Sequence, residues 1–416
     1  MNMGYHPVDK LVQADLIIIN TCAIREKAVN KAYGMIGRAY HEKKLRSQTI
    51  VGVTGCVVEI EKERILQRKG VDFALGTRSL DQLPGMISKA SMGKQSFSVG
   101  DGVPEIQSQI PRLRKSPHHA WITIIHGCDR FCSYCVVPYA RGREKSRQMS
   151  DILCEVTRWA KEGTQEITFL GQNVDAYGSD RPEDNARFST LLAEASKIEG
   201  IERIWFMTSY PSDFTSELID TIASIPKIAR SIHLPVQSGS DSILKKMNRR
   251  YSRLEYLDLL KSIRNRIPDA SISSDVIVGF PTESESDFGE TVSLVREARF
   301  ERLNLAMFSP RPRTVAAEKY LNDVSECEKN RRLRFLLELQ KSINAETNKP
   351  FLGASVEVMV ESQIKPASSL YYGRTNQNKI VIFPATPEEA GKRVRVRIEK
   401  TTAGPLYGSI MEGVAV

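Results

Sequence analysis

The sequence of 416 residues has no apolar run long enough to cross a membrane. Its longest apolar runs, such as residues 16–19 and 121–125, are far shorter than the roughly 20 residues that a membrane-spanning helix needs. The first residues, Met-Asn-Met-Gly-Tyr-His-Pro, lack the apolar core of a secretory signal. We therefore predict a cytoplasmic protein that has no membrane partner.

Histidine and cysteine are both scarce. The six histidines are scattered along the chain and give no reason to expect a Ser-His-Asp type of machinery. Seven cysteines, an odd number in a chain without a secretory signal, argue against a disulfide framework and favour reduced thiols, metal ligands or catalytic sulfur. The net charge of +9 makes the chain compatible with a polyanionic partner such as nucleic acid.

Residues 1–92 alternate short apolar runs with amphipathic segments, a pattern typical of an α/β domain. The pattern predicts strands over 16–20 and 50–53 and helices over 25–39 and 59–69. Cys22 and Cys56 follow the two strands directly. Because ligands bind at the carboxyl edge of open α/β sheets, we expect these two thiols at a binding edge.

Residues 93–113 are rich in Ser, Gln, Gly, Pro and Arg and are predicted to be a linker, with a short edge strand over 96–99. Residues 114–347 then repeat the strand–helix alternation on a larger scale. The predicted strands are 121–125, 166–170, 203–207, 231–234, 271–278 and 302–308, and predicted helices include 150–162, 254–264 and 331–343. Six βα units are too few for an eight-stranded barrel, so we expect an open, partial barrel whose function collects after the strands.

The hydrophobic period changes again in residues 348–415. Short strands are predicted over 355–360, 380–383 and 394–398, with turns at Tyr372-Gly373 and Gly404-Pro405. This pattern predicts a small all-β module at the carboxyl end.

Three cysteines share one short loop, His126-Gly-Cys128-Asp-Arg-Phe-Cys132-Ser-Tyr-Cys135, directly after the first predicted barrel strand. Soft thiolate ligands suit zinc or an iron–sulfur cluster. Structural zinc normally takes four ligands, and no second cysteine pair is near. Three ligands on a four-iron cluster leave one iron open to a substrate or cofactor. The alternatives are a zinc loop or three unrelated thiols, and Cys154 and Cys327 are expected to be structural or surface thiols.

This loop resembles that of the radical S-adenosylmethionine superfamily. The chain is further similar to its methylthiotransferase family in segments spread over nearly the whole length, namely Asn20-Thr-Cys-Ala-Ile-Arg-Glu26, Gly55-Cys56, Cys135-Val-Val-Pro-Tyr-Ala-Arg-Gly142, Phe169-Leu-Gly-Gln-Asn173, His233-Leu-Pro-Val-Gln-Ser-Gly-Ser240 and Asp275-Val-Ile-Val-Gly-Phe-Pro-Thr282. The final module, with Gly373-Arg-Thr-Asn-Gln-Asn378, resembles the RNA-binding TRAM domain.

The resemblance implies an α/β fold in three parts: an incomplete flavodoxin-like domain (1–92), a partial (β/α)6 radical SAM core (114–347) and a TRAM domain (348–415). It implies radical methylthiolation of C2 of N6-(dimethylallyl)adenosine beside the anticodon of tRNA. Two alternatives remain: a methylthiotransferase acting on threonylcarbamoyl-adenosine in tRNA, and a catalytically impaired, cluster-bearing RNA-binding protein. The implied partners are tRNA, an electron donor such as flavodoxin, and a sulfur source. The protein itself is expected to be a monomer.

The resemblance also assigns cofactors and residues. One 4Fe–4S cluster is expected on Cys128, Cys132 and Cys135, and S-adenosyl-L-methionine is expected to bind there. A second, auxiliary 4Fe–4S cluster is expected on Cys22 and Cys56. The family's third ligand, in a Gly-Cys-Gln-Met-Asn segment, has no counterpart in these residues, so we expect impaired methylthiolation with retained S-adenosylmethionine cleavage. The residues expected to contact the cofactor are Tyr134, Gly171, Gln172, Asn173, Gln237 and Gly279.

Basic residues recur in the predicted carboxyl-terminal strands. Arg393, Arg395 and Arg397 alternate along one strand and would face the same side. With Arg374 they form a candidate RNA-binding stripe that contacts phosphates. The simpler alternative is a solvated strand edge whose charges prevent aggregation.

Overall fold

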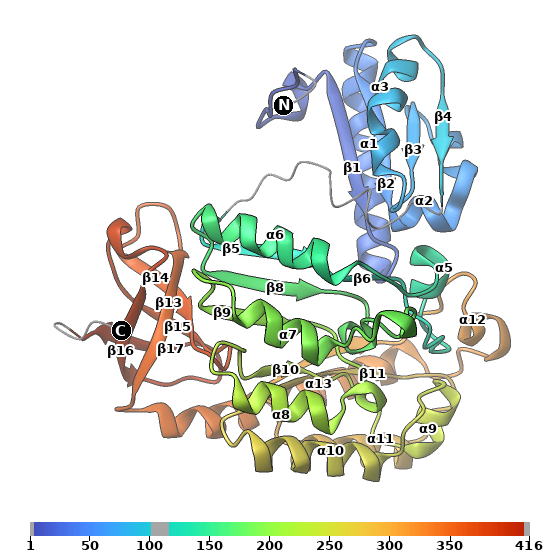
Figure 1. Cartoon of the computed structure of the whole chain (residues 1–416). Coiled ribbons are helices and arrows are strands. Elements are labelled where there is room, and N and C mark those ends of the chain that lie inside the picture. Colours follow the sequence, from blue (N-terminus) through green and yellow to red (C-terminus); the bar gives the residue numbers. More distant parts are fainter. Residues whose placement is uncertain (1–3, 101–115, 412–416) are drawn as a thin grey trace. The chain divides into compact units, whose positions relative to one another are not determined.

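The computed structural model describes residues 4–100 and 116–411, which belong to two compact units (Figure 1). We call them the amino-terminal unit (Met1–Leu113, His126–Asp151 and Ser309–Lys319) and the barrel unit (Arg114–Ile125, Ile152–Phe308 and Tyr320–Val416). Most of the predicted linker, from residue 101 on, lies outside the described residues.

A four-stranded parallel sheet organises the amino-terminal unit. Its strands, in spatial order, are β1 (Leu16–Thr21), β2 (Ile50–Gly55), β3 (Phe73–Leu75) and β4 (Ser96–Ser98). The structure therefore confirms three predicted strands, at 16–20, at 50–53 and, as a short edge strand, over 96–99. Ile17 and Val51 belong to one apolar core, whereas Phe73 and Leu75 belong to another. β1 lies at the edge of this sheet and buries alternate residues, Ile17 and Ile19, whereas Ile18 is 41% exposed, so its continuous apolar run does not reflect cover on both faces.

Helix α1 (Glu26–Leu45) packs on β1 and β2, and α3 (Leu83–Ser91) packs on β3 and β4 (Figure 1). The single helix predicted over 59–69 is wrong. The chain forms α2 (Cys56–Glu61) and then a 3-10 helix (Lys62–Gln67), because Lys62 adopts a φ of 53° that interrupts the α-helical path. Short 3-10 helices also span Leu11–Gln13 and Leu80–Gln82.

Six parallel strands follow one another in chain order in the barrel unit. They form two three-stranded sheets, one of β5 (His119–Thr123), β8 (Glu166–Leu170) and β9 (Arg203–Phe206), the other of β10 (Ser231–His233), β11 (Ser271–Val278) and β12 (Arg302–Met307). The Ser209 amide donates to the His233 carbonyl oxygen at 3.1 Å and links the two sheets. The prediction of an open six-stranded barrel is confirmed.

Helices alternate with these strands along the chain (Figure 1). The α-helices are α6 (Met149–Lys161), α7 (Phe188–Ser196), α8 (Ser216–Ser224), α9 (Asp241–Lys246), α10 (Arg253–Arg266), α11 (Glu285–Ala298) and α13 (Glu326–Asn348). Short 3-10 helices span Val174–Ala176, Pro182–Asp184, Pro211–Asp213 and Lys349–Phe351. Within the described ranges, no helix combines the length and apolarity needed to span a membrane.

The carboxyl-terminal strands close into a small barrel in the order β13 (Ser355–Gln363), β14 (Leu370–Arg374), β15 (Ile380–Pro384), β17 (Leu406–Ile410) and β16 (Arg393–Lys400), with a 3-10 helix at Pro387–Glu389. The predicted turn at Tyr372-Gly373 is wrong, because both residues lie within β14. A Cβ atom on Gly373 would lie well inside van der Waals contact of the Met359 carbonyl oxygen. The glycine therefore permits close approach of two strands and does not mark a turn.

Candidate active site

The three-cysteine loop lies in the amino-terminal unit, between β6 (Ile125–His126) and α5 (Val137–Arg141). Cys128, Cys132 and Cys135 are all half-buried, and Tyr134 is half-buried beside them. The Cys135 amide donates to the Cys132 carbonyl oxygen at 2.9 Å, so the last two cysteines share one turn. The structure thus brings the predicted ligands onto one short, partly solvent-accessible segment.

Hydrogen bonds fasten this loop to the segment that follows α5. The Cys128 amide donates to the Gly142 carbonyl oxygen at 3.2 Å. The Asp129 amide donates to Glu144 Oε1 at 3.1 Å, and the Glu144 amide donates back to Asp129 Oδ1 at 3.3 Å. Gly127 has a φ of 78°, and a Cβ atom there would overlap the Arg143 carbonyl. These reciprocal contacts fix the path of the loop before any ligand binds.

The thiols have the environment of cluster ligands. Burial raises the pKa of the Cys128 thiol to about 12, and the neighbouring Cys132 and Glu144 raise it as well. A buried thiol of this kind ionises readily only when a metal takes up the thiolate. No group of three Cys, His, Asp or Glu side chains in the described residues converges on a position for a single metal ion. A four-iron cluster needs no such convergence, because each thiolate binds a different iron, and this donor set fits it.

Cys22 and Cys56 also meet at one edge of a sheet. They follow Thr21 and Gly55, which are paired across β1 and β2. Thr21 Oγ1 donates to the Thr54 carbonyl oxygen at 2.6 Å and accepts from the Val57 amide at 3.2 Å, which ties the two strand ends together.

A cavity of about 310 Å³ adjoins these two cysteines. Its lining includes Ala23 and Val57, the residues that follow Cys22 and Cys56, and also Arg311. Burial lowers the pKa of Arg311, and its guanidinium interacts with Glu26 and Cys22. Sequence reasoning missed Arg311, which no local pattern connects with Cys22. The two thiols, the adjoining space and the cation suit an anionic sulfur-bearing group.

Apart from Tyr134 in the three-cysteine loop, the residues predicted to bind S-adenosylmethionine lie after barrel strands. Gly171, Gln172 and Asn173 follow β8. The Asn173 side chain is 2% exposed, and its Nδ2 donates to Asp213 Oδ2 at 2.7 Å. Its Oδ1 is buried and accepts no hydrogen bond from the described residues. An ammonium group would satisfy this acceptor, so the site fits the predicted cofactor.

Gln237 and Gly279 occupy the same edge of the second sheet. The Gln237 backbone, at a φ of 73°, donates to Asp275 O at 2.8 Å and accepts from the Ile277 amide at 3.0 Å. Gly279 follows β11 at a φ of 69° and donates its amide to Glu283 Oε2 at 2.6 Å. This left-handed backbone is strained at Gln237, which is not a glycine, and strained residues of this kind tend to gather at ligand sites.

The four predicted RNA-binding arginines divide into two pairs. Arg395 and Arg397 are exposed on β16. Arg393 instead pairs with Glu357 at 3.0 Å, and Arg374 pairs with Glu361 at 3.0 Å. Only the first pair presents uncommitted guanidinium groups of the kind that phosphates bind.

Sequence reasoning also missed a polar network inside the barrel. His233 Nδ1 lies 2.9 Å from Ser273 Oγ, and His233 Nε2 lies 3.3 Å from Asp275 Oδ2. Asn304 Nδ2 donates to Asp275 Oδ1 at 2.8 Å. The available signal was the alternation of polar with apolar residues along β11, which is unusual for a parallel strand covered on both faces.

Comparison with known families finds a match in three parts of the chain. Residues 122–295 match the Radical SAM superfamily, residues 350–411 match the TRAM domain, and residues 1–76 match the uncharacterized protein family UPF0004. A solved radical S-adenosylmethionine methyltransferase, TsrM from Kitasatospora setae, shares the fold with a TM-score of 0.55 at 14% identity, over 73% of this chain and 64% of that one.

Full-length relatives share much more sequence. A tRNA-2-methylthio-N(6)-dimethylallyladenosine synthase from Thermotoga petrophila is 54% identical over 99% of this chain and 92% of its own length. Proteins of the same name from Pseudothermotoga lettingae and Desulforamulus reducens are 50% and 41% identical, over 98% and 99% of this chain and 93% and 90% of their own lengths. The predicted resemblance is confirmed, and the chain belongs to the tRNA-2-methylthio-N(6)-dimethylallyladenosine synthase family.

Proposed function

We propose that this protein methylthiolates C2 of N6-(dimethylallyl)adenosine in tRNA. The observation that carries the proposal is a fastened loop with three half-buried thiols, in a chain 54% identical to a synthase of that name over 99% of its length. An aromatic C–H bond has no usefully acidic proton, so ordinary acid–base catalysis does not suffice for this substitution.

The residues of the chain bind and orient the reactants. Cys128, Cys132 and Cys135 hold a 4Fe–4S cluster that, with S-adenosylmethionine bound, supplies one-electron cleavage of a sulfonium. Asn173 Oδ1, the buried acceptor, receives the ammonium of the methionine moiety. Gly279, at the end of β11, contributes its backbone to the adenine site, and the Lys329 side chain fills the space that a Cβ atom there would take.

The remaining parts of the proposal concern the sulfur and the partners. Cys22 and Cys56 bind the auxiliary cluster beside the cavity that Arg311 lines. Arg395 and Arg397, exposed on the TRAM domain, contact the phosphates of the tRNA. A flavodoxin-like protein supplies electrons, a separate donor supplies sulfur, and the protein works as a cytoplasmic monomer.

Reconstitution under anaerobic conditions tests the proposal. The protein, loaded with iron and sulfide, is incubated with S-adenosylmethionine, a reductant and tRNA that carries N6-(dimethylallyl)adenosine. Mass spectrometry of the digested nucleosides should detect the 2-methylthio product, and its yield per deoxyadenosine measures how far an auxiliary site of two cysteines, Cys22 and Cys56, impairs the transfer. Cys135→Ala should abolish the product, whereas Cys154→Ala, which removes an exposed thiol from helix α6, should retain it.

A product with threonylcarbamoyl-adenosine tRNA, and none with the dimethylallyl substrate, would contradict the choice of nucleoside. Deoxyadenosine formation without either product would indicate a radical enzyme that lacks the transfer step. RNA binding without deoxyadenosine would favour the impaired RNA-binding protein.

A further inference from the structure

A chamber of about 520 Å³ lies inside the barrel unit, a volume in the range typical of small-molecule sites. Each of the six strands contributes to it: His119, Trp121, Glu166, Thr168, Trp205, Ser231, His233, Ser271, Ser273, Arg302 and Asn304 line the chamber. On β5, β8, β11 and β12 these residues alternate and lie in the amino-terminal part or middle of the strand, whereas the lining reaches the last residues of β9 and β10, Phe206 and His233. Neither Asn173 nor Gly279 is among the lining residues. The chamber is therefore distinct from the edge that carries Asn173 and Gly279.

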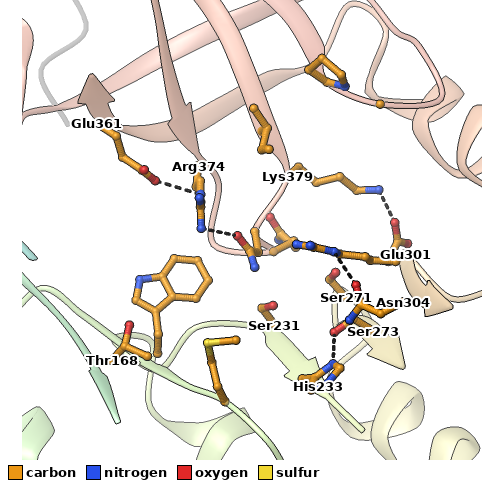
Figure 2. A pocket seen from close by; sticks show the side chains of 18 of the residues that line it. Thr168, Ser231, His233, Ser271, Ser273, Glu301, Asn304, Glu361, Arg374 and Lys379 are labelled. Atoms are coloured by element: carbon orange, nitrogen blue, oxygen red, sulfur yellow. Dashed lines mark hydrogen bonds and ion pairs between the residues drawn. The ribbon is translucent and has the colours of Figure 1, made fainter. Parts of the chain in front are cut away.

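The carboxyl-terminal barrel and the end of helix α13 form the rest of the wall. Figure 2 shows Arg374 extending from that barrel into the space above the strand residues, and Lys379 reaching Glu301 at its side. The hairpin between β14 and β15 thus closes the chamber. A domain matched as TRAM, which the sequence relates to RNA binding, supplies part of the lining of an internal site.

The charges of the lining are mostly neutralised within the protein. Arg374 pairs with Glu361 at 3.0 Å, and Lys379 pairs with Glu301 (Figure 2). Glu166 pairs with the buried Arg203 at 3.2 Å. The remaining lining cation, Arg302, is exposed and donates to Asn304. A ligand that suits such a lining is neutral and polar, not a phosphate group.

The chamber also offers an aromatic surface. Trp121 is 52% exposed although it lies on a barrel strand, and the His119 ring stacks on it at 4.9 Å with an interplanar angle of 19°. Burial lowers the pKa of His119 to about 4, helped by the nearby Arg374, so the ring is neutral at physiological pH. Met207, 43% exposed, lines the same space. Exposed aromatic faces of this kind bind flat heterocycles by stacking.

Hydrogen-bonding groups surround the aromatic surface. Thr168, Ser231, Ser271 and Ser273 supply hydroxyls, and Asn304 supplies an amide (Figure 2). Hydroxyls and amides recognise the edges of nucleobases, whose donors and acceptors are uncharged.

We propose that this chamber binds one unpaired base of the RNA substrate, which stacks on Trp121 and is recognised at its edge by the hydroxyl and amide groups of the strands. This proposal depends on the proposed function in one respect, namely that the RNA substrate is a tRNA. It assigns Arg374 to the wall of a base site, whereas Arg397 on the outer surface remains a phosphate contact.

The salt dependence of RNA binding separates the two kinds of contact. The probe is an RNA stem-loop with an unpaired loop, and its affinity for the full chain is measured over a range of salt concentrations. Trp121→Ala should weaken binding about tenfold at every salt concentration, because the lost stacking involves no counterion release. Arg397→Ala should instead lower the slope of log affinity against log salt by about 1.

Two further variants guard against misfolding. Trp121→Phe keeps an aromatic face and should restore most of the affinity. Phe335→Ala removes an aromatic side chain of α13 that is 43% exposed and does not line the chamber, so its affinity should equal that of the unchanged protein.

Tryptophan emission gives a direct readout of stacking. The stem-loop should quench the emission of the unchanged protein, and a stem-loop with abasic loop nucleotides should quench much less. In Trp121→Phe most of the quenching by the intact loop should disappear while binding persists. Unchanged affinity in Trp121→Ala, or equal quenching by the intact and abasic loops, would overturn the proposal. Neither result depends on methylthio product, so the chamber and the proposed function can fail separately.

Discussion

A buried ion pair beneath the Gly279 loop allows a quantitative prediction. Glu283 and Arg332 have side chains that are 1% and 5% exposed. Arg332 Nη1 donates to Glu283 Oε2 at 2.7 Å, and the same oxygen accepts from the Gly279 amide at 2.6 Å. Burial raises the pKa of Glu283, while the Gly279 amide and Arg332 act to lower it. The ion pair therefore stabilises the charged form of the Glu283 carboxylate at a position that solvent does not reach.

Replacing Arg332 with methionine keeps much of the side-chain volume but removes the cation. The Glu283 carboxylate is then buried without a charged partner, and removing one partner of a buried pair costs about 3–5 kcal/mol. The double variant Glu283→Gln/Arg332→Met should recover most of this loss, because the remaining amide can still accept from the Gly279 backbone and carries no charge. The double variant should therefore lose much less free energy of unfolding than the sum of the losses in the two single variants.

The assay is urea unfolding followed by tryptophan emission. All three tryptophans, Trp121, Trp159 and Trp205, lie in the barrel unit with the ion pair, so the signal reports that unit. The variant should move the transition midpoint with little change in slope.

The pH dependence has a definite sign. Loss of Arg332 raises the folded pKa of Glu283 further above its unfolded value. A carboxyl group whose folded pKa is raised contributes stability below the unfolded pKa and loses it as the pH rises through the folded pKa. The deficit of Arg332→Met should therefore be smaller at about pH 5 than at about pH 8. A loss below about 1 kcal/mol, or a double variant as unstable as the sum of the single ones, would refute the reasoning.

Other substitutions probe the remaining sites. Gly127→Ala should lower iron bound per chain, measured after reconstitution, because its Cβ would overlap the Arg143 carbonyl; Gly34→Ala, in open space on α1, should load normally. Gly373→Ala should weaken binding of the stem-loop RNA by distorting the carboxyl-terminal barrel, because its Cβ atom would overlap the Met359 carbonyl oxygen. Asn173→Ala should weaken S-adenosylmethionine binding, measured by calorimetry, by about tenfold, the value of a hydrogen bond to a charged group.

The parts of the fold that local patterns specify were predictable. Strands β8 and β11 have the predicted bounds, because a continuous or alternating apolar run between turn residues has few other solutions. Glycine was more ambiguous. The same residue type marks turns and close strand contacts, so the signal at Gly373 led to a turn where β14 runs straight through.

The geometry of the site depended on contacts that no local pattern contains. Asn173 and Asp213 are 40 positions apart, and Glu283 and Arg332 are 49 positions apart. Single-sequence reasoning placed Asn173 after a strand but had no basis for choosing its partner. It also assigned Arg374 to RNA contact from the grouping of basic residues and the resemblance to a TRAM domain, whereas the ion pair with Glu361 depends on how β13 and β14 align. The predicted role of Arg374 in RNA contact stays a prediction.

Along each barrel strand, the residues that face the helices and the residues that line the chamber serve different purposes. On β8, Ile167 and Phe169 are completely buried, and they alternate with Glu166 and Thr168, which line the chamber. Helices cover the outer face of such a barrel, so the outward residues must be apolar for the unit to fold. The inward residues need not be apolar where they line a chamber that accommodates a polar ligand. If the chamber is the base site proposed above, its preference can change at every second position without loss of the apolar core, whereas the edge proposed for the cofactor includes Gly279, whose φ of 69° favours glycine.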